Sequence, residues 1–277
     1  MKVAFQGEAG AYSEEAGHDY FVSAEMIPCE SFDIVFDKVF SGECQSGLIP
    51  IENSLAGSIH HNYDLLLRHK LHIIGEYYLR VRHCLISFPD AHLAGITHVM
   101  SHPQALGQCD GYLRNLGVKT RPVYDTSGSV KMLKDSGERN TAAIASKRAA
   151  EIYGMQILEA GIEDNPENYT RFIEISPKIV APEGDVKTSI VVSLKNIPGA
   201  LFKALSVFAL RDIDLTKIES RPQAGKPWEY LFYIDFLGVV NEESVRRALN
   251  HLDEYAIMLR VLGSYTRFPL DTFKPLA

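Results

Sequence analysis

A hydroxyl and a guanidinium stand side by side at Thr170 and Arg171, in the stretch EDNPENYTRFIEI. The stretch begins acidic and turn-rich, and Pro166 excludes regular structure just before the pair. Apolar alternation through Phe172 and Ile175 then predicts a strand. A loop therefore delivers two hydrogen-bond donors to the mouth of an apolar strand, where both are candidates for chemistry.

Polar side chains also follow the apolar strand expected in GLIPIENSLAGSI, which ends at Ile51. Glu52, Asn53 and Ser54 come next, and ligands in open α/β sheets bind outside the carboxyl ends of strands. Ser54 is a plausible helix N-cap, which accounts for the Asn-Ser pair without any function. Capping does not account for a carboxylate directly after a buried-looking strand, so we interpret Glu52 as functional.

Two further segments, VMSHPQALGQCDGYL and YDTSGSVKML, repeat this plan, although N-capping alone explains any one of their hydroxyls. In the first turn, FQGEAGAYSEE, Gly7 and Gly10 allow close backbone approach at a helix start that favours an anion, but the spacing is not that of a dinucleotide site. Polar groups and helix N–H donors thus recur at four strand ends, which suits a polyanionic small molecule. In the two repeated segments these polar residues are Ser101, His102, Gln104, Thr126, Ser127 and Ser129.

The composition is that of an ordinary globular protein, with 277 residues, 46% hydrophobic and 23% charged. A formal charge of −7 argues against nucleic-acid binding and requires local positive potential for any anionic substrate. Four cysteines without a CxxC pair are expected to be reduced thiols. The start MKVAFQG has no secretory or transit character, and no run is long enough to span a membrane. We therefore expect a cytoplasmic protein without a membrane partner.

A dense group of histidines raises the question of a metal site. The group lacks an HExxH pattern or carboxylate partners at ligand spacing, so a solvated helix face explains it better. We expect no metal. The histidines are His60, His61, His69 and His72.

The clearest domain boundary is PKIVAPEGDVK, residues 177–187, where prolines and a glycine interrupt the periodic patterns. The chain beyond it predicts the order βαββαβ, which is the ferredoxin-like arrangement. Its helices show apolar residues at helical spacing, so each is expected to bury one face. The expected stripes are Leu201, Leu205 and Phe208 on the first helix, and Val245, Ala248, Leu249 and Leu252 on the second.

Residues 1–180 alternate short strands with helical patterns, which predicts an α/β fold with mostly parallel strands. The stretch HIIGEYYLRVRHCLISF, residues 72–88, has the character of a long extended crossing between two lobes. The chain must then return near residue 160, which would put Thr170 back beside the first lobe.

At this point the sequence resembles a known family. PIENSLAGSI, SHPQALGQC and especially NYTRF look like the motifs of prephenate dehydratase. The downstream module is similar to an ACT domain with that family's effector signatures, here NIPGAL at 196–201 and ESRP at 219–222. The resemblance covers residues 1 to about 266, and NYTRF together with ESRP makes it specific.

The resemblance implies a two-lobed α/β catalytic domain, similar to a type II periplasmic-binding protein, over residues 1–180. The lobe crossings would lie near 75–85 and 158–165, and the ACT domain would span 187–266. Without a preceding chorismate mutase segment, the chain resembles the monofunctional bacterial form. The implied reaction converts prephenate to phenylpyruvate, carbon dioxide and water without a cofactor. A homodimer or homotetramer would assemble through the ACT domains and bind L-phenylalanine there.

The family's essential hydroxyl maps to Thr170, and Glu52 and Asn53 complete the expected catalytic set, with the carboxyl group at 52 and the hydroxyl at 170 bordering one crevice. Alternation would point Arg171 away from Thr170, so its role stays open. Either Thr170 or a protonated Glu52 would supply the proton. The expected substrate-binding residues are Ser54, Ser101, His102, Gln104, Thr126, Ser127, Arg171 and Phe172.

The effector site is expected where a strand gives way to a helix, because exposed N–H groups there receive a carboxylate. Leu201 would contact an aromatic ring, and the ESRP stretch would close the pocket from a neighbouring chain. Arogenate in place of prephenate, and an amino-acid sensor without turnover, remain the alternatives. The expected effector residues are Asn196, Pro198, Gly199, Ala200, Leu201, Glu219, Ser220, Arg221 and Pro222.

Overall fold

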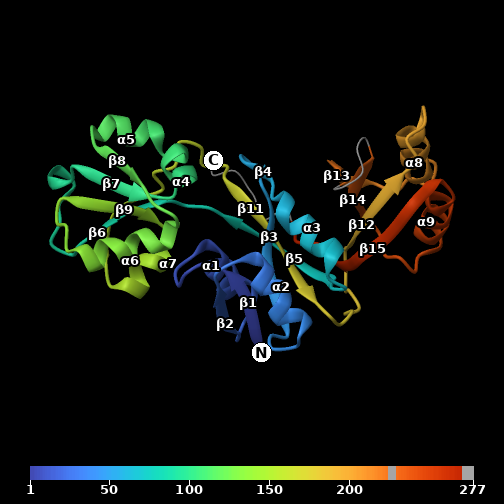
Figure 1. Cartoon of the computed structure of the whole chain (residues 1–277), viewed down its shortest axis with the longest axis horizontal. Helices are drawn as coiled ribbons and strands as arrows, with labels where there is room; N and C mark the ends of the chain where they lie inside the picture. The colour runs from blue at the N-terminus through green and yellow to red at the C-terminus, as the bar shows by residue number, and fades with distance from the viewer. Residues whose placement is uncertain (224–228, 270–277) are drawn as a thin grey trace. The chain divides into compact units, whose positions relative to one another are not determined.

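A computed structural model describes residues 1–223 and 229–269 (Figure 1). Close backbone contacts divide the chain into two compact units, residues 1–69 with 77–173 and residues 70–76 with 174–277. The division falls inside two strands, β5 (His72–Arg80) and β11 (Tyr169–Ser176). This division therefore lies earlier in the chain than residues 177–187, where the prolines and the glycine predicted the domain boundary.

The first lobe of the first unit is built on a parallel sheet core. β1 pairs in parallel with β2 on one side and with β3 on the other, and the full strand order is β2-β1-β3-β11-β5, with β4 beside β3. Val3, Leu48 and Phe172 lie together in the core of this lobe, each almost fully buried. The elements before β5 are β1 (Lys2–Gln6), α1 (Tyr12–Tyr20), β2 (Glu25–Cys29), α2 (Phe32–Phe40), β3 (Ser46–Asn53), β4 (Gly57–Ser58) and α3 (His60–Arg68).

The second lobe carries a five-stranded sheet in the order β10-β6-β9-β7-β8, drawn mainly in green in Figure 1. β7 is parallel to β8 and β9. β6 and β10 carry the chain into and out of the lobe and pair antiparallel with each other, and β6 is also antiparallel to β9. Every residue of β9 is buried, as expected of a central strand covered on both faces. The elements are β6 (Cys84–Ser87), a 3₁₀ turn (Leu93–Gly95), β7 (His98–Ser101), α4 (Pro103–Gln108), α5 (Asp110–Leu116), β8 (Lys119–Pro122), α6 (Thr126–Ser136), β9 (Thr141–Ala145), α7 (Lys147–Tyr153) and β10 (Gln156–Ala160).

The two lobes touch at a backbone-to-backbone contact beside Gly10. Ser146 Oγ, at the N-cap of α7, donates a hydrogen bond of 2.6 Å to the Gly10 carbonyl. A Cβ at Gly10 would lie 2.7 Å from Ala149 Cα, and the residue has a φ of +87°. Only glycine therefore permits this approach.

The second unit contains a βαββαβ module with the antiparallel order β13-β14-β12-β15. The predicted fold class, a two-lobed α/β part followed by a ferredoxin-like module, is confirmed. The elements are β12 (Val186–Leu194), α8 (Ala200–Ala209), β13 (Leu215–Pro222), β14 (Tyr230–Leu237), α9 (Glu243–Tyr255) and β15 (Ala256–Thr266).

The two helices of this module differ in how well their apolar stripes were predicted. All four stripe residues of α9, Val245, Ala248, Leu249 and Leu252, are buried. On α8 the buried residues are instead Ala204, Val207 and Phe208, and Leu201 is exposed. The prediction for α8 is therefore right for Phe208 and wrong for Leu201, because the face that packs on the sheet is rotated toward Ala204 and Val207.

A buried ion pair lies within the second unit. Lys187 Nζ, on β12, lies 2.7 Å and 2.9 Å from the two carboxylate oxygens of Glu76 on β5. The side chains are 4% and 0% exposed, and Phe268 N–H donates to the same carboxylate. Such a pair offsets the cost of burying its charges only while both partners are present.

Replacing Lys187 with methionine should destabilise the second unit by about 3–5 kcal/mol, because it leaves the Glu76 carboxylate buried without its cation. Calorimetry of the whole chain would show a lowered unfolding transition for this unit. The double variant Lys187→Met/Glu76→Leu should regain most of the loss. The control is Lys147→Met on the exposed Lys147–Glu151 pair, where a change above about 1 kcal/mol is not expected.

Candidate active site

A cavity of about 190 Å³ lies in the first unit and is walled by both of its lobes. The first lobe contributes the end of β3, the start of β11 and the start of α1. The second lobe contributes α4 and the start of α6. Its lining contains both polar and apolar side chains. The lining residues are Tyr12, Ser13, Pro50, Asn53, Ile59, Val81, His83, His102, Gln104, Ala105, Gln108, Thr126, Asn168, Thr170 and Phe172.

Thr170 is held at the cavity by the side-chain amide of Asn53. The Asn53 oxygen accepts the backbone N–H groups of Leu55 and Ala56, at 3.0 Å and 2.9 Å. That fixes which end of the amide is nitrogen, and this nitrogen donates to Thr170 Oγ1 at 3.0 Å. Thr170 is therefore an acceptor toward Asn53, and its own O–H hydrogen stays available for another partner.

The same amide begins a chain of polar contacts through the site. Asn53 Nδ2 donates to Asn168 Oδ1 at 2.8 Å, and Asn168 Nδ2 donates to Gln108 Oε1 at 3.1 Å. Gln108 Oε1 lies 2.8 Å from His83 Nε2, and His83 Nδ1 lies 2.7 Å from the Tyr12 hydroxyl. Both lobes and one of the segments that join them contribute to this chain.

The hydrogen-bond pattern decides the state of His83. Gln108 Oε1 can only accept, so His83 Nε2 carries a proton; in a neutral imidazole Nδ1 then accepts from the Tyr12 hydroxyl at 2.7 Å, which is shorter than the 3.1 Å contact of the same hydroxyl with the Arg82 carbonyl. Burial lowers the pKa of His83, against the opposing effects of Gln108 and Glu163. Burial also raises the pKa of Tyr12 well above its usual value, so the phenol keeps its proton. The pair is therefore a neutral imidazole beside a neutral phenol.

The sequence reasoning did not select four members of this chain. Asn168 lies in the motif NYTRF and Gln108 in SHPQALGQC, but the predicted site residues were others in these motifs, among them Thr170 and Gln104. His83 lies in the segment expected to cross between the lobes, and Tyr12 in the expected helix start. A lone histidine or tyrosine in such a position carries no chemical signal until its neighbours are known.

Several expected substrate-binding residues do line the cavity: His102, Gln104, Thr126 and Phe172. The imidazole of His102 accepts the Gln104 backbone N–H at 3.2 Å and so caps α4 as well. Phe172 is 1% exposed and supplies apolar surface next to Thr170. These residues, Asn53 and Thr170 therefore line one cavity.

Glu52 and Arg171 are not among the residues that line the cavity. Strand alternation explains this for Arg171, since Thr170 and Phe172 on either side of it both line the cavity and Arg171 points to the other face of β11. Arg171 is 5% exposed, and its guanidinium carbon lies 6.0 Å from the centre of the Tyr78 ring. The structure thus does not place the Glu52 carboxyl group at the crevice beside Thr170, where it was expected.

The three expected serines also stand outside the cavity lining and make local structural contacts. Ser54 Oγ donates to the Glu167 carbonyl at 2.8 Å, which anchors the loop before β11. Ser101 Oγ donates to the Ile144 carbonyl at 2.7 Å. Ser127 Oγ donates to Asp125 at 2.9 Å, within the cap of α6. Turn and cap chemistry accounts for all three.

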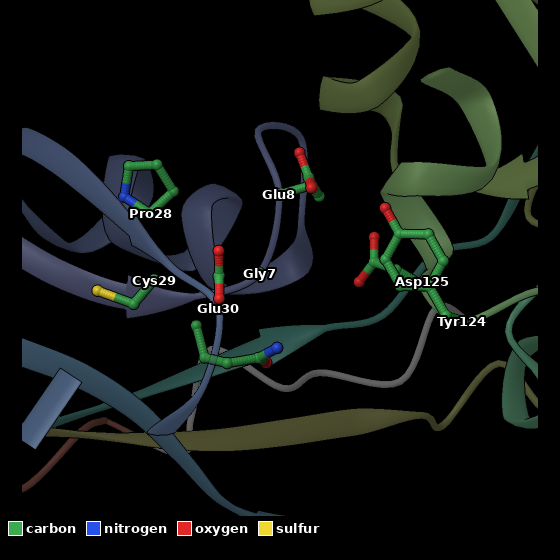
Figure 2. Close-up of a pocket in the computed structure, with 8 residues that line it drawn as sticks. Gly7, Glu8, Pro28, Cys29, Glu30, Tyr124 and Asp125 are labelled. Carbon is green, nitrogen blue, oxygen red and sulfur yellow. The ribbon is translucent and has the colours of Figure 1, made fainter. Parts of the chain in front are cut away.

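A larger cavity of about 480 Å³ lies nearby in the same unit, since Asp125 lines it while Thr126 lines the smaller one. Figure 2 shows Glu8, Glu30 and Asp125 on the segments that surround it. Burial, Glu8 and Asp125 raise the pKa of Tyr124 in this cavity. Because three carboxyl groups would repel a dianion, the smaller cavity is the better site for an anionic substrate.

The second unit has a cavity of about 240 Å³ at the start of α8. Gly199 is the left-handed N-cap of this helix, and Leu201, Tyr230 and Phe232 provide apolar lining. Of the expected effector residues, Asn196, Gly199, Ala200 and Leu201 line the cavity. Glu219–Pro222 lie on β13 and pair with Tyr230–Tyr233 of β14, outside the lining.

Among residues 1–223 and 229–269, no group of three or more His, Cys, Asp or Glu side chains is arranged to hold a metal ion. Within the same ranges, no helix has both the length and the apolar character needed to cross a bilayer.

Comparison with known proteins identifies both parts of the chain. Residues 3–179 match the family model for prephenate dehydratase, and residues 188–254 match that for the ACT domain. A curated relative from Arabidopsis thaliana, described as arogenate dehydratase/prephenate dehydratase 2, chloroplastic, is 47% identical over 283 residues, covering 98% of this chain and 74% of its own.

Solved structures match over nearly the whole chain. Prephenate dehydratase from Arthrobacter aurescens in complex with L-Phe is 32% identical, with a TM-score of 0.88, and the match covers 96% of this chain and 90% of that one. A protein described as GqqA, a novel type of quorum quenching acylase, is also 32% identical, with a TM-score of 0.91, and the match covers 98% and 100%.

One expectation is overturned by these comparisons. The prediction of a cytoplasmic protein is wrong, because the Arabidopsis thaliana relative at 47% identity is described as chloroplastic. The prediction rested on the first residues, which have no transit character, and on unpaired cysteines, which report a reducing environment and do not identify the compartment.

The prephenate dehydratase match spans more than half of the chain, and the curated relative spans nearly all of it. The chain therefore belongs to the prephenate dehydratase family and is a dehydratase of L-phenylalanine biosynthesis with an ACT domain after its catalytic part.

Proposed function

We propose that the 190 Å³ cavity is the dehydratase site and that Thr170 assists departure of the ring hydroxyl of prephenate. The observation that carries this proposal is the donation from Asn53 Nδ2 to Thr170 Oγ1, which leaves the threonine hydrogen for the substrate. The departing hydroxyl takes a proton and leaves as water. The electrons of the bond to the leaving carboxylate complete the aromatic ring, and carbon dioxide is released.

Electrostatics at the cavity favour a dianion despite the acidic chain. No Lys or Arg stands among the described residues that line it. Instead, α1 and α6 begin at the cavity from opposite lobes, at Tyr12 and Thr126. A helix N-terminus carries partial positive charge, which favours a carboxylate, although Asp125 already accepts the Gly128 N–H at the start of α6 and Glu14 accepts the Gly10 N–H just before α1. A carboxylate held there, away from bulk water, is aligned to leave as carbon dioxide.

Replacing Thr170 with alanine should lower kcat by about 10²–10⁴-fold, because a positioned hydrogen-bond donor to the leaving group is lost. Steady-state assay of phenylpyruvate formation would measure this loss. Thr170→Ser keeps the hydroxyl and should stay within about tenfold of the parent. An alanine variant with near-normal turnover would remove Thr170 from the chemistry.

Prephenate rather than arogenate is the proposed substrate, although the curated Arabidopsis thaliana relative is named for both activities. Arogenate carries an ammonium group in place of the side-chain keto group. No Asp or Glu stands among the described lining residues, so a buried ammonium would lack an anionic partner.

We expect kcat/KM for prephenate to exceed that for arogenate by at least about tenfold, from the cost of an unsatisfied buried charge. Parallel assays of the two substrates at matched pH would give the ratio. Equal or higher kcat/KM with arogenate would show that acceptors outside the described lining serve its ammonium group. No turnover of either substrate would favour the amino-acid-sensor alternative.

Acyl transfer is the second activity to consider, because the chain resembles a protein described as a quorum quenching acylase. A threonine nucleophile needs a neighbouring base to take its proton. The partner found at Thr170 Oγ1 is the amide nitrogen of Asn53, which donates and cannot act as that base. The contacts of Thr170 therefore support the dehydratase reaction better than acyl transfer.

Regulation by L-phenylalanine is proposed at the 240 Å³ cavity of the second unit. N–H groups at the start of α8 would receive the amino acid's carboxylate, and Leu201, Tyr230 and Phe232 would surround its ring. The solved relative from Arthrobacter aurescens was crystallised with L-Phe, which supports this effector. Effector binding would favour one of two conformational states and so change activity.

Leu201→Ala should weaken L-phenylalanine binding by about 15–60-fold, since two to three methylene equivalents that contact the ligand are lost, at about 0.8 kcal/mol each. Titration calorimetry would report the change in Kd. Leu210→Ala is the matched control, because Leu210 ends the same helix, is 77% exposed and is not among the lining residues. Equal affinity in both variants would place the effector elsewhere.

The expected homodimer or homotetramer through the ACT module is retained as part of this proposal. Several large apolar side chains on the module are exposed, which suits burial against a second copy. The monofunctional bacterial form also stays a prediction, since the relatives include plant and bacterial proteins. The exposed residues are Ile197, Phe202, Ile218, Ile257 and Met258.

A further inference from the structure

We infer that His83 is a positioning residue for the dehydratase reaction, whose Nε2–H, through Gln108 and Asn168, holds the Asn53 amide that orients Thr170. This inference rests on the proposed role of Thr170. It assigns a function to a buried imidazole that the reaction itself does not require.

The donors and acceptors along this series of hydrogen bonds are compatible with only one orientation of each side-chain amide. Backbone N–H groups at Leu55 and Ala56 force the oxygen of Asn53 toward them, so its nitrogen faces Asn168 and Thr170. Asn168 must then present its oxygen to Asn53 and its nitrogen to Gln108. Each amide fixes the next one, because a flip at any position would set two donors or two acceptors face to face.

The last member of the chain is the imidazole, and Nε2–H is the group that Gln108 Oε1 can accept. Tyr12 secures this tautomer by donating to Nδ1. The backbone N–H of His83 itself donates to the Glu163 carboxylate at 2.9 Å, which holds the residue in place. His83 is 2% exposed, so water does not compete for these contacts.

This series of hydrogen bonds also joins segments that are far apart in the sequence. Gln108 ends α4 in the second lobe, and Asn53 ends β3 in the first, while Asn168 lies in the loop before β11. Asp164, in that same loop, accepts the N–H groups of Gly111 and Tyr112 at the start of α5. The orientation of Thr170 therefore depends on both lobes being in contact.

Replacing His83 with leucine should lower kcat for prephenate by about 10–100-fold, the usual effect of losing a residue that orients a functional side chain. KM should change by less than about threefold. His83→Gln places an amide N–H where Nε2–H stands, so it should recover most of kcat. Steady-state kinetics of the folded variants, checked by circular dichroism, would measure both.

The decisive measurement is the double variant Thr170→Ala/His83→Leu. Once the threonine hydroxyl is gone there is nothing left to orient, so its kcat should equal that of Thr170→Ala alone. A second multiplicative loss of tenfold or more would overturn the positioning role and leave His83 a general stabiliser. Full activity in His83→Leu with an inactive Thr170→Ala would refute this inference while sparing the proposed function.

A second variant covers the case in which His83→Leu does not fold. Gln108→Leu removes the acceptor from the other end of the contact, whereas Gln108→Glu keeps an oxygen acceptor for both neighbours. We expect the leucine variant to lose kcat and the glutamate variant to retain most of it. Nitrogen-15 shifts of His83 should also show a neutral Nε2–H tautomer at pH 7, and an Nδ1–H tautomer or imidazolium would contradict the inference.

Discussion

The hydrogen bond from Asn53 to Thr170 is the interaction on which the catalytic site depends. The threonine oxygen accepts a hydrogen bond from Asn53, and the hydroxyl hydrogen stays available to donate to another partner. Two backbone N–H groups hold the amide in this sense, and the turn after β3 supplies them. The tight turn after β3 therefore orients the Asn53 side chain in the proposed active site.

Charge at the site comes from the backbone more than from side chains. The chain carries a formal charge of −7, and the larger cavity of the first unit presents three carboxyl groups. The smaller cavity is instead faced by the starts of α1 and α6. We therefore propose the smaller cavity for the dianion, chiefly because the larger one presents three carboxyl groups.

Sequence patterns predicted the fold class and the strand ends that surround the site, because periodicity and turn chemistry are local properties. They did not decide which side chains at these strand ends face the cavity. Glu52 and Asn53 were both expected at the crevice, and of the two only Asn53 lines the cavity. His83 and Gln108 needed the tertiary structure, since their roles exist only where segments distant in the sequence meet. Leu201 was assigned both to the apolar stripe of its helix and to the effector pocket; it is exposed on α8 and lines the cavity, because spacing alone does not say which of two apolar faces packs on the sheet.

The division inside β5 and β11 bears on how far the two halves of this protein are separable pieces. Glu76 and the end of β11 belong to the same compact unit as the ACT module, although they precede the proline-rich boundary at 177–187. A gene fragment ending before Lys187 would encode Glu76 without Lys187, and so would lose an ion pair of the second unit. Recombination at residues 177–187 would therefore divide the second unit, because Glu76 and the end of β11 would be separated from the ACT module.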